Sequence, residues 1–123
     1  MDIIIRNSGG VPIYDQITRQ MKGLILRGEL KEGEALPSMR LLAKELRISV
    51  ITTKRAYEEL EREGYITSVP GKGSFAAEIN RELLREEQYK RLEEHLNEAV
   101  DAARTAGISL GEMKELLETL YEG

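Results

Sequence analysis

The chain has 123 residues, which suffices for one compact domain with a short appendage and leaves no room for a second, catalytic domain. Hydrophobic residues make up 41% and charged residues 33%, a balance typical of a soluble globular protein. The absence of cysteine excludes disulfides, cysteine-ligated zinc and thiol catalysis. No apolar run is long enough to span a membrane and the first residues lack the pattern of a signal peptide, so we expect a cytoplasmic protein.

The net charge of −4 is distributed unevenly along the chain. Residues 1–78 hold 12 Lys and Arg and 11 Asp and Glu, whereas residues 79–123 hold 6 and 11. Within residues 38–55 there are five basic residues and one acidic residue. Because a DNA-binding protein needs a local basic face rather than a basic total, this short segment is compatible with a nucleic-acid partner.

The first part of the chain predicts a short strand followed by an amphipathic helix. Residues 3–5 are three isoleucines, a β-prone run. Pro12 suits the first position of a helix because its nitrogen carries no hydrogen, and five apolar residues within 14–25 recur at helical spacing. Gly28 is expected to end this helix as a left-handed cap, and residues 29–37 are predicted to form a polar loop.

Two short helices separated by a tight turn are predicted next. Ser38 and Ser49 each stand where a side-chain N-cap would begin a helix, and Gly64 would end the second one near Glu63. The turn between the helices consists of residues 47–48. The side chains expected to be available for the core are Leu41, Leu42, Ala43 and Leu46 in the first helix, and Ile51, Ala56, Tyr57 and Leu60 in the second.

The period then changes from helical to extended. Residues 65–69 and 74–77 predict two strands, which Pro70-Gly71-Lys72-Gly73 joins in a hairpin with a basic tip. A helix, a helix–turn–helix pair and a hairpin in this order indicate a winged helix-turn-helix. Its second helix can enter the major groove of DNA, and Lys72 can reach phosphate or the adjacent minor groove. The fold class is therefore mostly α with a small β-hairpin wing (α+β).

Residues 79–123 predict a tail of two helices. The first begins near Asn80 and is broken by Gly107, and Ser109 and Glu112 form a capping box that begins the second. Both helices carry an apolar stripe, which we interpret as a dimer interface; the alternative is that the helices fold back on their own domain. The predicted interface residues are Tyr89, Leu92, Leu96, Val100, Leu110, Met113, Leu117 and Leu120.

His95 is the only histidine, and Glu98 follows it at helical spacing. A metal site or a pH switch is conceivable there, but a lone helical histidine is more often an ordinary surface or interface residue. One histidine on a charged helix gives no basis for a Ser/His/Asp arrangement, and no phosphate-cradling glycine motif is present. We therefore expect neither an enzyme nor a bound metal or cofactor.

The motifs taken together resemble the GntR family of regulators. Residues 36–43 are similar to its L-P-S-x-R-x-L-A signature, residues 48–66 to its recognition helix, residues 70–75 to its wing and residues 11–17 to the opening of its first helix. The resemblance covers residues 10–78, which we predict to be the DNA-binding domain. A two-helix tail of this size is similar to the YtrA-type subfamily, whose members are compact dimeric repressors, often of transporter operons.

The resemblance implies a homodimeric repressor that binds double-stranded DNA at a palindromic operator. Arg47 stands where the family commonly has glycine, so it is expected to adopt a left-handed conformation. A winged-helix module that binds proteins and not DNA remains the alternative, and the sequence identifies no effector. The residues predicted to contact DNA are Ser38, Arg40, Arg47, Ser49, Val50, Thr52, Thr53, Lys54, Arg55, Gly71, Lys72 and Gly73. The alternative for the two threonines is that at least one packs inward, and of Val50 and Ile51 one is expected to face DNA and the other the core.

Overall fold

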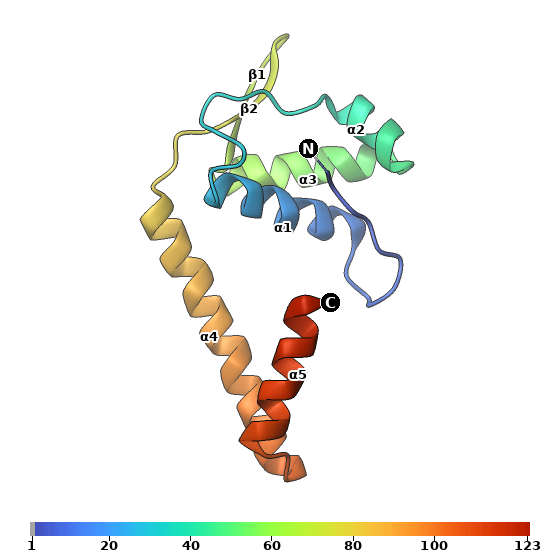
Figure 1. The fold of residues 1–123 in the computed structure, drawn as a ribbon. Coiled ribbons are helices and arrows are strands. Elements are labelled where there is room, and N and C mark those ends of the chain that lie inside the picture. Colours follow the sequence, from blue (N-terminus) through green and yellow to red (C-terminus); the bar gives the residue numbers. More distant parts are fainter. Residues whose placement is uncertain (1) are drawn as a thin grey trace. The chain divides into compact units, whose positions relative to one another are not determined.

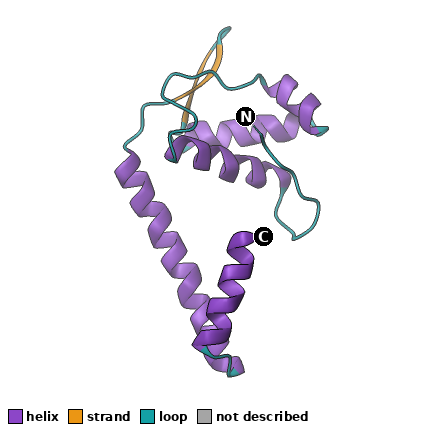
Figure 2. Cartoon of the chain, viewed as in Figure 1, coloured by secondary structure: helices purple, strands orange, loops and turns teal. Residues whose placement is uncertain are grey.

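The computed structural model describes residues 2–123 and divides the chain into two compact units, one through Arg81 and one from Glu82. Helices dominate the described residues, and one two-stranded antiparallel sheet accompanies them, which confirms the predicted fold class (Figure 2). None of the described helices is long and apolar enough to cross a membrane. In chain order the elements are α1 (Ile13–Leu26), α2 (Met39–Leu46), α3 (Val50–Arg62), β1 (Ile66–Val69), β2 (Gly73–Ala76), α4 (Arg81–Ala106) and α5 (Leu110–Glu122) (Figure 1).

The helices of the first unit begin at the predicted capping residues. The hydroxyl of Ser38 accepts a hydrogen bond from the backbone N–H of Leu41 (3.1 Å), and that of Ser49 accepts one from Ile51 (3.1 Å). Helix α1 begins one residue later than predicted, because the backbone of Pro12 is still extended (ψ 144°). These caps satisfy N–H groups that have no partner inside a helix, and so fix where α2 and α3 start.

The helices of this unit end in a common left-handed turn. After α3, Gly64 (φ 84°) lets the N–H of Tyr65 donate to the carbonyl of Leu60 at 2.9 Å. After α2 the same turn is made by Arg47 (φ 57°), which confirms the predicted left-handed conformation there. For a residue with a side chain this conformation costs roughly 1–2 kcal/mol. Arg47 therefore closes the turn between α2 and α3 at an energetic cost that glycine would not incur.

The core of the first unit lies among α1, α2 and α3. The prediction that Leu41 and Ile51 help to form it is wrong, since their exposed fractions are 47% and 79%. On α3, the residues at 53, 56, 57 and 60 share one helical face, and Ile51 lies on the opposite side. The fully buried side chains of the core include Ile17, Met21 and Ile25 from α1 and Ala56, Tyr57 and Leu60 from α3.

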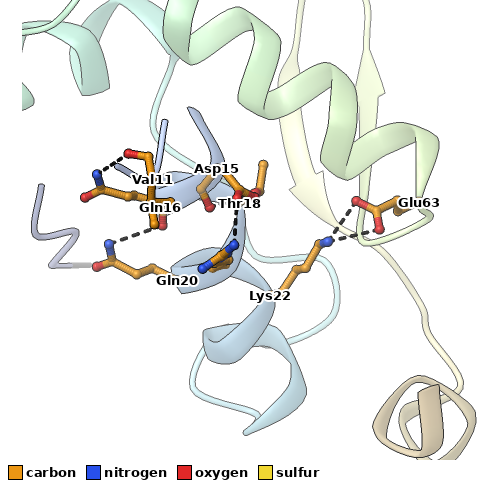
Figure 3. Close-up of polar contacts among 8 residues, drawn as sticks. Val11, Asp15, Gln16, Thr18, Gln20, Lys22 and Glu63 are labelled. Carbon is orange, nitrogen blue, oxygen red and sulfur yellow. Dashed lines mark hydrogen bonds and ion pairs between the residues drawn. The ribbon is translucent and has the colours of Figure 1, made fainter. Parts of the chain in front are cut away.

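The predicted strand at residues 3–5 does not form; two glutamine side chains of α1 pair with the extended segment instead. The amide of Gln20 accepts from the N–H of Ile4 (2.9 Å) and donates to its carbonyl (2.7 Å). Gln16 makes the same pair with Arg6 (2.8 and 2.7 Å). Its amide also donates to the carbonyl of Val11, as Figure 3 shows. Four residues of a helix and two residues of extended chain both span about 6 Å along their axes. The side-chain amides of Gln16 and Gln20 are therefore spaced to pair with every second residue of the extended segment.

The hairpin has the predicted position and gains an additional edge from the loop before α2. Thr67 pairs with Phe75, and the N–H of Lys72 donates to the carbonyl of Val69 (2.9 Å) across the turn. In the loop, Leu36 donates to the carbonyl of Ser74 (2.9 Å), and a further bond joins Ala76 to Glu34. Part of the predicted polar loop is therefore an extended segment that ties the wing to the helices.

The second unit consists of α4 and α5, joined by a turn at Gly107 (φ 71°). The predicted capping box is confirmed, because the hydroxyl of Ser109 accepts from the N–H of Glu112 at 3.1 Å and the Glu112 carboxylate accepts from Ser109 N–H. Only Ala103 is buried in α4, and no residue of α5 is buried. The single chain thus leaves most of the apolar side chains of this unit exposed.

Candidate nucleic-acid interface

Helix α3 is fastened to the beginning of α2 by two buried hydroxyl groups. The Oγ1 of Thr53 lies 3.0 Å from the carbonyl oxygen of Met39 and 2.9 Å from that of Val50. The hydroxyl of Tyr57 donates to the carbonyl of Pro37 at 2.6 Å, and burial raises the pKa of Tyr57 above its ordinary value. One bond reaches the first residue of α2 and the other the loop residue before its cap. Together they hold α3 against the start of α2, as a helix needs in order to enter a groove in one orientation.

Thr53 is the predicted DNA contact that the structure contradicts. Its exposed fraction is 0%, and its hydroxyl bonds inward, so it cannot reach DNA. The neighbouring Thr52 is half-buried and retains an accessible edge. Since Thr53 shares a helical face with Ala56 and Tyr57, the spacing of the buried residues separates the two threonines.

The other side chains predicted on α3 lie on its exposed face or at its cap. Val50 is 44% exposed and Ile51 is more exposed still, so both are available to a partner. Lys54 is exposed, with its ammonium 3.9 Å from the carboxylate of Glu58. Ser49 is exposed at the N-terminus of the helix, where the backbone N–H groups favour an anion such as phosphate.

Four of the predicted basic contacts have no acidic partner in the part of the chain that the structure describes. These four side chains lie free of carboxylates within 4.0 Å, whereas Lys22, Arg27 and Arg62 are paired with Glu63, Glu29 and Glu59. A cation that is already paired must give up its partner before it binds phosphate, and an unpaired one need not. The four unpaired cations are Arg40 in α2, Arg47 in the turn, Arg55 in α3 and Lys72 in the wing.

The wing presents its basic residue at the end of a tight turn. Figure 1 shows the hairpin of β1 and β2 projecting from the three helices of the first unit. Gly71 (φ 76°) and Gly73 (φ 113°) flank Lys72 in conformations that glycine adopts without strain. Lys72 is exposed in this turn, and Ser38 at the cap of α2 and Arg40 in its first turn are exposed as well. The structure thus brings every predicted contact except Thr53 to the surface of one unit, at least in part.

Two contacts between α1 and α3 were not predicted from the sequence. The guanidinium carbon of Arg55 lies 3.8 Å from the centre of the Tyr14 ring. At the other end of α1, the ammonium of Lys22 lies 2.8 Å from the carboxylate of Glu63, as Figure 3 shows. Tyr14 belongs to the apolar stripe of α1, and this position alone predicts a core residue. The contact with Arg55 could not be predicted, because it depends on how α1 and α3, which are far apart in the sequence, pack against each other.

The second unit carries no site for a metal among the described residues. His95 is exposed on α4, and no three His, Asp or Glu side chains within residues 2–123 are grouped to hold an ion. The residues predicted to form a dimer interface are exposed or half-buried. Five of them exceed half exposure: Tyr89, Leu92, Leu110, Leu117 and Leu120.

Comparison with known proteins places this chain among regulators. Residues 13–76 match the model of the gntR family of bacterial regulatory proteins. The transcriptional repressor YtrA of Bacillus subtilis (strain 168) is 38% identical over 109 residues, which cover 89% of this chain and 84% of that protein. A GntR family transcriptional regulator from Listeria monocytogenes has a TM-score of 0.70 at 30% identity, over 91% of this chain and 97% of that one.

The DNA-binding domain of AraR, solved in complex with operator ORX1, has the same fold. Its TM-score is 0.56 at 22% identity, over 63% of this chain and 96% of that one. The family match spans more than half of the chain, and the similarity to YtrA extends beyond the matched domain into the tail. The chain therefore belongs to the GntR family of bacterial regulatory proteins and resembles YtrA over most of its length.

Proposed function

We propose that this chain is a sequence-specific DNA-binding transcriptional regulator, which acts as a repressor in the manner of its relative YtrA. The observation that carries the proposal is that four of the predicted basic contacts on the helix-turn-helix and wing have no acidic partner among the described residues. Three of the four lie in α2, its turn or α3, where α3 is held against the start of α2. Family membership and the name of the repressor YtrA support the same function.

The start of α3 enters the major groove in this proposal. Val50 and Thr52 offer methyl groups and a hydroxyl to base edges, and Arg40 reaches guanine or phosphate from the first turn of α2. Lys72 contacts phosphate or the adjacent minor groove from the wing. Lys54 adds a further phosphate contact after it releases Glu58, at little cost because an exposed ion pair contributes little.

The protein binds as a homodimer in this proposal, with the second unit as its interface. The support is the exposed apolar stripe of α4 and α5, which a second copy of the same helices can cover. A two-fold dimer presents two α3 helices to successive major grooves, and so matches a palindromic operator. Relatives of the YtrA type suggest a transporter operon as the target.

Selection of bound sequences from a random duplex pool tests the proposal. We expect a palindromic sequence to be enriched, and its affinity to fall steeply between two salt concentrations as counterions are released. Arg40→Ala should weaken binding to the selected operator by about 1–3 kcal/mol if Arg40 reads guanine. The matched control is Arg27→Ala, which removes a cation that is paired with Glu29 and lies outside the proposed interface.

Two results would contradict the proposal. If no sequence is enriched and only weak, salt-sensitive binding remains, the winged helix serves contact with a protein instead. If Arg40→Ala and Arg27→Ala bind both operator and random DNA as tightly as the original protein, Arg40 does not belong to the interface.

A further inference from the structure

The stacked pair of Tyr14 and Arg55 joins a residue of α1 to the exposed face of α3. The Cζ of Arg55 lies over the Tyr14 ring, 3.8 Å from its centre, a distance at which a guanidinium packs against an aromatic face. Arg55 is exposed on α3 beside Lys54, and no carboxylate among the described residues lies within 4.0 Å of it. Within residues 2–123, the Tyr14 ring is therefore the group that its guanidinium contacts.

Stacking of this kind leaves the hydrogen-bonding edge of a guanidinium free. The five N–H donors lie in the plane of the group, so a ring that covers one face blocks none of them. An exposed arginine loses side-chain freedom when it binds phosphate, and that loss reduces affinity. A guanidinium that is already held against a ring loses less freedom on binding.

Tyr14 can hold Arg55 in place because α1 is itself fixed against α3. At the far end of α1, Lys22 lies 2.8 Å from Glu63, and its side chain is largely buried with an exposed fraction of 12%. The ammonium of Lys22 also lies 5.4 Å from the ring of Tyr65. Between these ends, Ile17, Met21 and Ile25 are buried, so the position of Tyr14 relative to α3 is well defined.

We propose that Tyr14 is a positioning residue for DNA binding, which holds the Arg55 guanidinium ready for a phosphate beside the major groove. The inference rests on the proposed function and extends the interface to α1, which lies outside the helix-turn-helix. Lys54 illustrates the alternative arrangement, since its ammonium lies near Glu58 and must leave it to bind. The phosphate contact is made by Arg55, and Tyr14 acts only through it.

The test compares Tyr14→Phe, Tyr14→Leu and Arg55→Gln on the selected operator over a series of salt concentrations. Tyr14→Phe keeps the ring and should bind as the original protein does. Tyr14→Leu should lower affinity about two- to ten-fold per protomer, the cost of immobilising one further side chain on binding, and leave the salt dependence nearly unchanged. Arg55→Gln should reduce the slope of log affinity against log salt by about 1 per protomer.

A double-mutant cycle separates positioning from general packing. In the Arg55→Gln background, Tyr14→Leu should have no further effect on affinity. Arg40 has no cation–π contact with a ring among the described residues, so in the Arg40→Gln background the effect of Tyr14→Leu should add to that of Arg40→Gln. Arg55→Lys is a second variant, and because Arg55 is exposed we expect it to fold as the original protein does. It should keep the salt slope and lose most of the coupling to Tyr14, because a lysine ammonium stacks less well.

Several outcomes would overturn the proposal. If Tyr14→Phe is as weak as Tyr14→Leu, the hydroxyl itself contacts DNA. If Tyr14→Leu weakens binding equally in the Arg55→Gln background, or does not weaken it at all, no coupling exists. An unchanged salt slope in Arg55→Gln removes the phosphate contact. Failure of the proposed function would look different from failure of this inference, because the original protein itself would then select no operator sequence.

Discussion

Arg47 closes the turn of the helix-turn-helix in a conformation that is costly for a residue with a side chain. We predict that Arg47→Gly raises the free energy of unfolding by about 0.5–1 kcal/mol, since glycine relieves the strain but loses more entropy on folding. The same change should lower DNA affinity through loss of a cation. Urea unfolding and operator binding measure the two effects separately.

Gly64 provides the matched control, because it occupies the same left-handed position at the end of α3 (φ 84°). Gly64→Ala should destabilise the protein by about 1 kcal/mol or more, in the opposite direction to Arg47→Gly. If Arg47→Gly is instead less stable than the original protein, the arginine side chain contributes contacts that outweigh its backbone strain.

Tyr57 makes stability depend on alkaline pH. Burial raises its pKa in the folded state above the unfolded value of about 10, so its contribution is complete below pH 10 and is lost as the pH rises further. We predict that Tyr57→Phe is less stable at neutral pH by about 1 kcal/mol, because the hydrogen bond to Pro37 is lost.

The advantage of the original protein over Tyr57→Phe should shrink as the pH rises above 10, by up to about 1.4 kcal/mol per pH unit, and should reverse before about pH 11.5. Urea unfolding at a series of alkaline pH values measures it. Parallel curves for the original protein and Tyr57→Phe would show that Tyr57 has the same pKa in both states.

Residue-level features were predicted well wherever local chemistry decides them. Ser38, Ser49 and Gly64 act at the ends of single helices, so their roles follow from the residues around them. Thr53 was misassigned because a threonine suits both a base contact and a buried bond to a carbonyl. Its partner, the carbonyl of Met39, lies on another helix and is not visible in the local sequence.

At the scale of elements, the N-terminal segment depends on two side chains of α1. We predict that Gln20→Ala accelerates hydrogen exchange of the Ile4 amide by about ten-fold or more, since that N–H would then face water. The amide of Arg6, which Gln16 holds, serves as the internal control and should change much less. Equal acceleration at both amides would mean that the segment detaches as one unit.

The type and order of the helices could be predicted, but two extended segments could not. Residues 3–5 have the composition of a strand, yet their partners are glutamine amides that no strand pattern reveals. Residues 34–36 lie between Gly33 and Pro37, which predict a loop, yet they pair with β2. In both segments the hydrogen-bond partner lies on another element, so the fold decides the pairing and local propensity does not.

At the scale of the whole molecule, the second unit should control assembly. We predict that Leu117→Glu converts a dimer into a monomer, because it places a charge in the apolar stripe of α5, and that operator affinity falls sharply as a result. Sedimentation at several concentrations measures the mass. Thr119→Glu adds the same charge to the opposite face of α5 and should remain dimeric.

If Leu117→Glu and Thr119→Glu sediment alike as dimers, another surface joins the two chains. Most of the apolar side chains that the sequence assigns to the stripes of α4 and α5 are exposed in the structure, and their role as an interface stays a prediction. The sequence left open what covers them, since the covering surface belongs to a different part of the chain or to a different molecule.

Helix α5 has 13 residues and buries none of them within its own chain. A helix of this length is marginal in water without packing, so in the proposed dimer its persistence would depend on how often two chains meet. A freshly synthesised chain at low abundance would spend much of its time with this segment unfolded and open to proteases. Degradation would then slow as the regulator accumulates, which gives its cellular level a threshold rather than a gradual response.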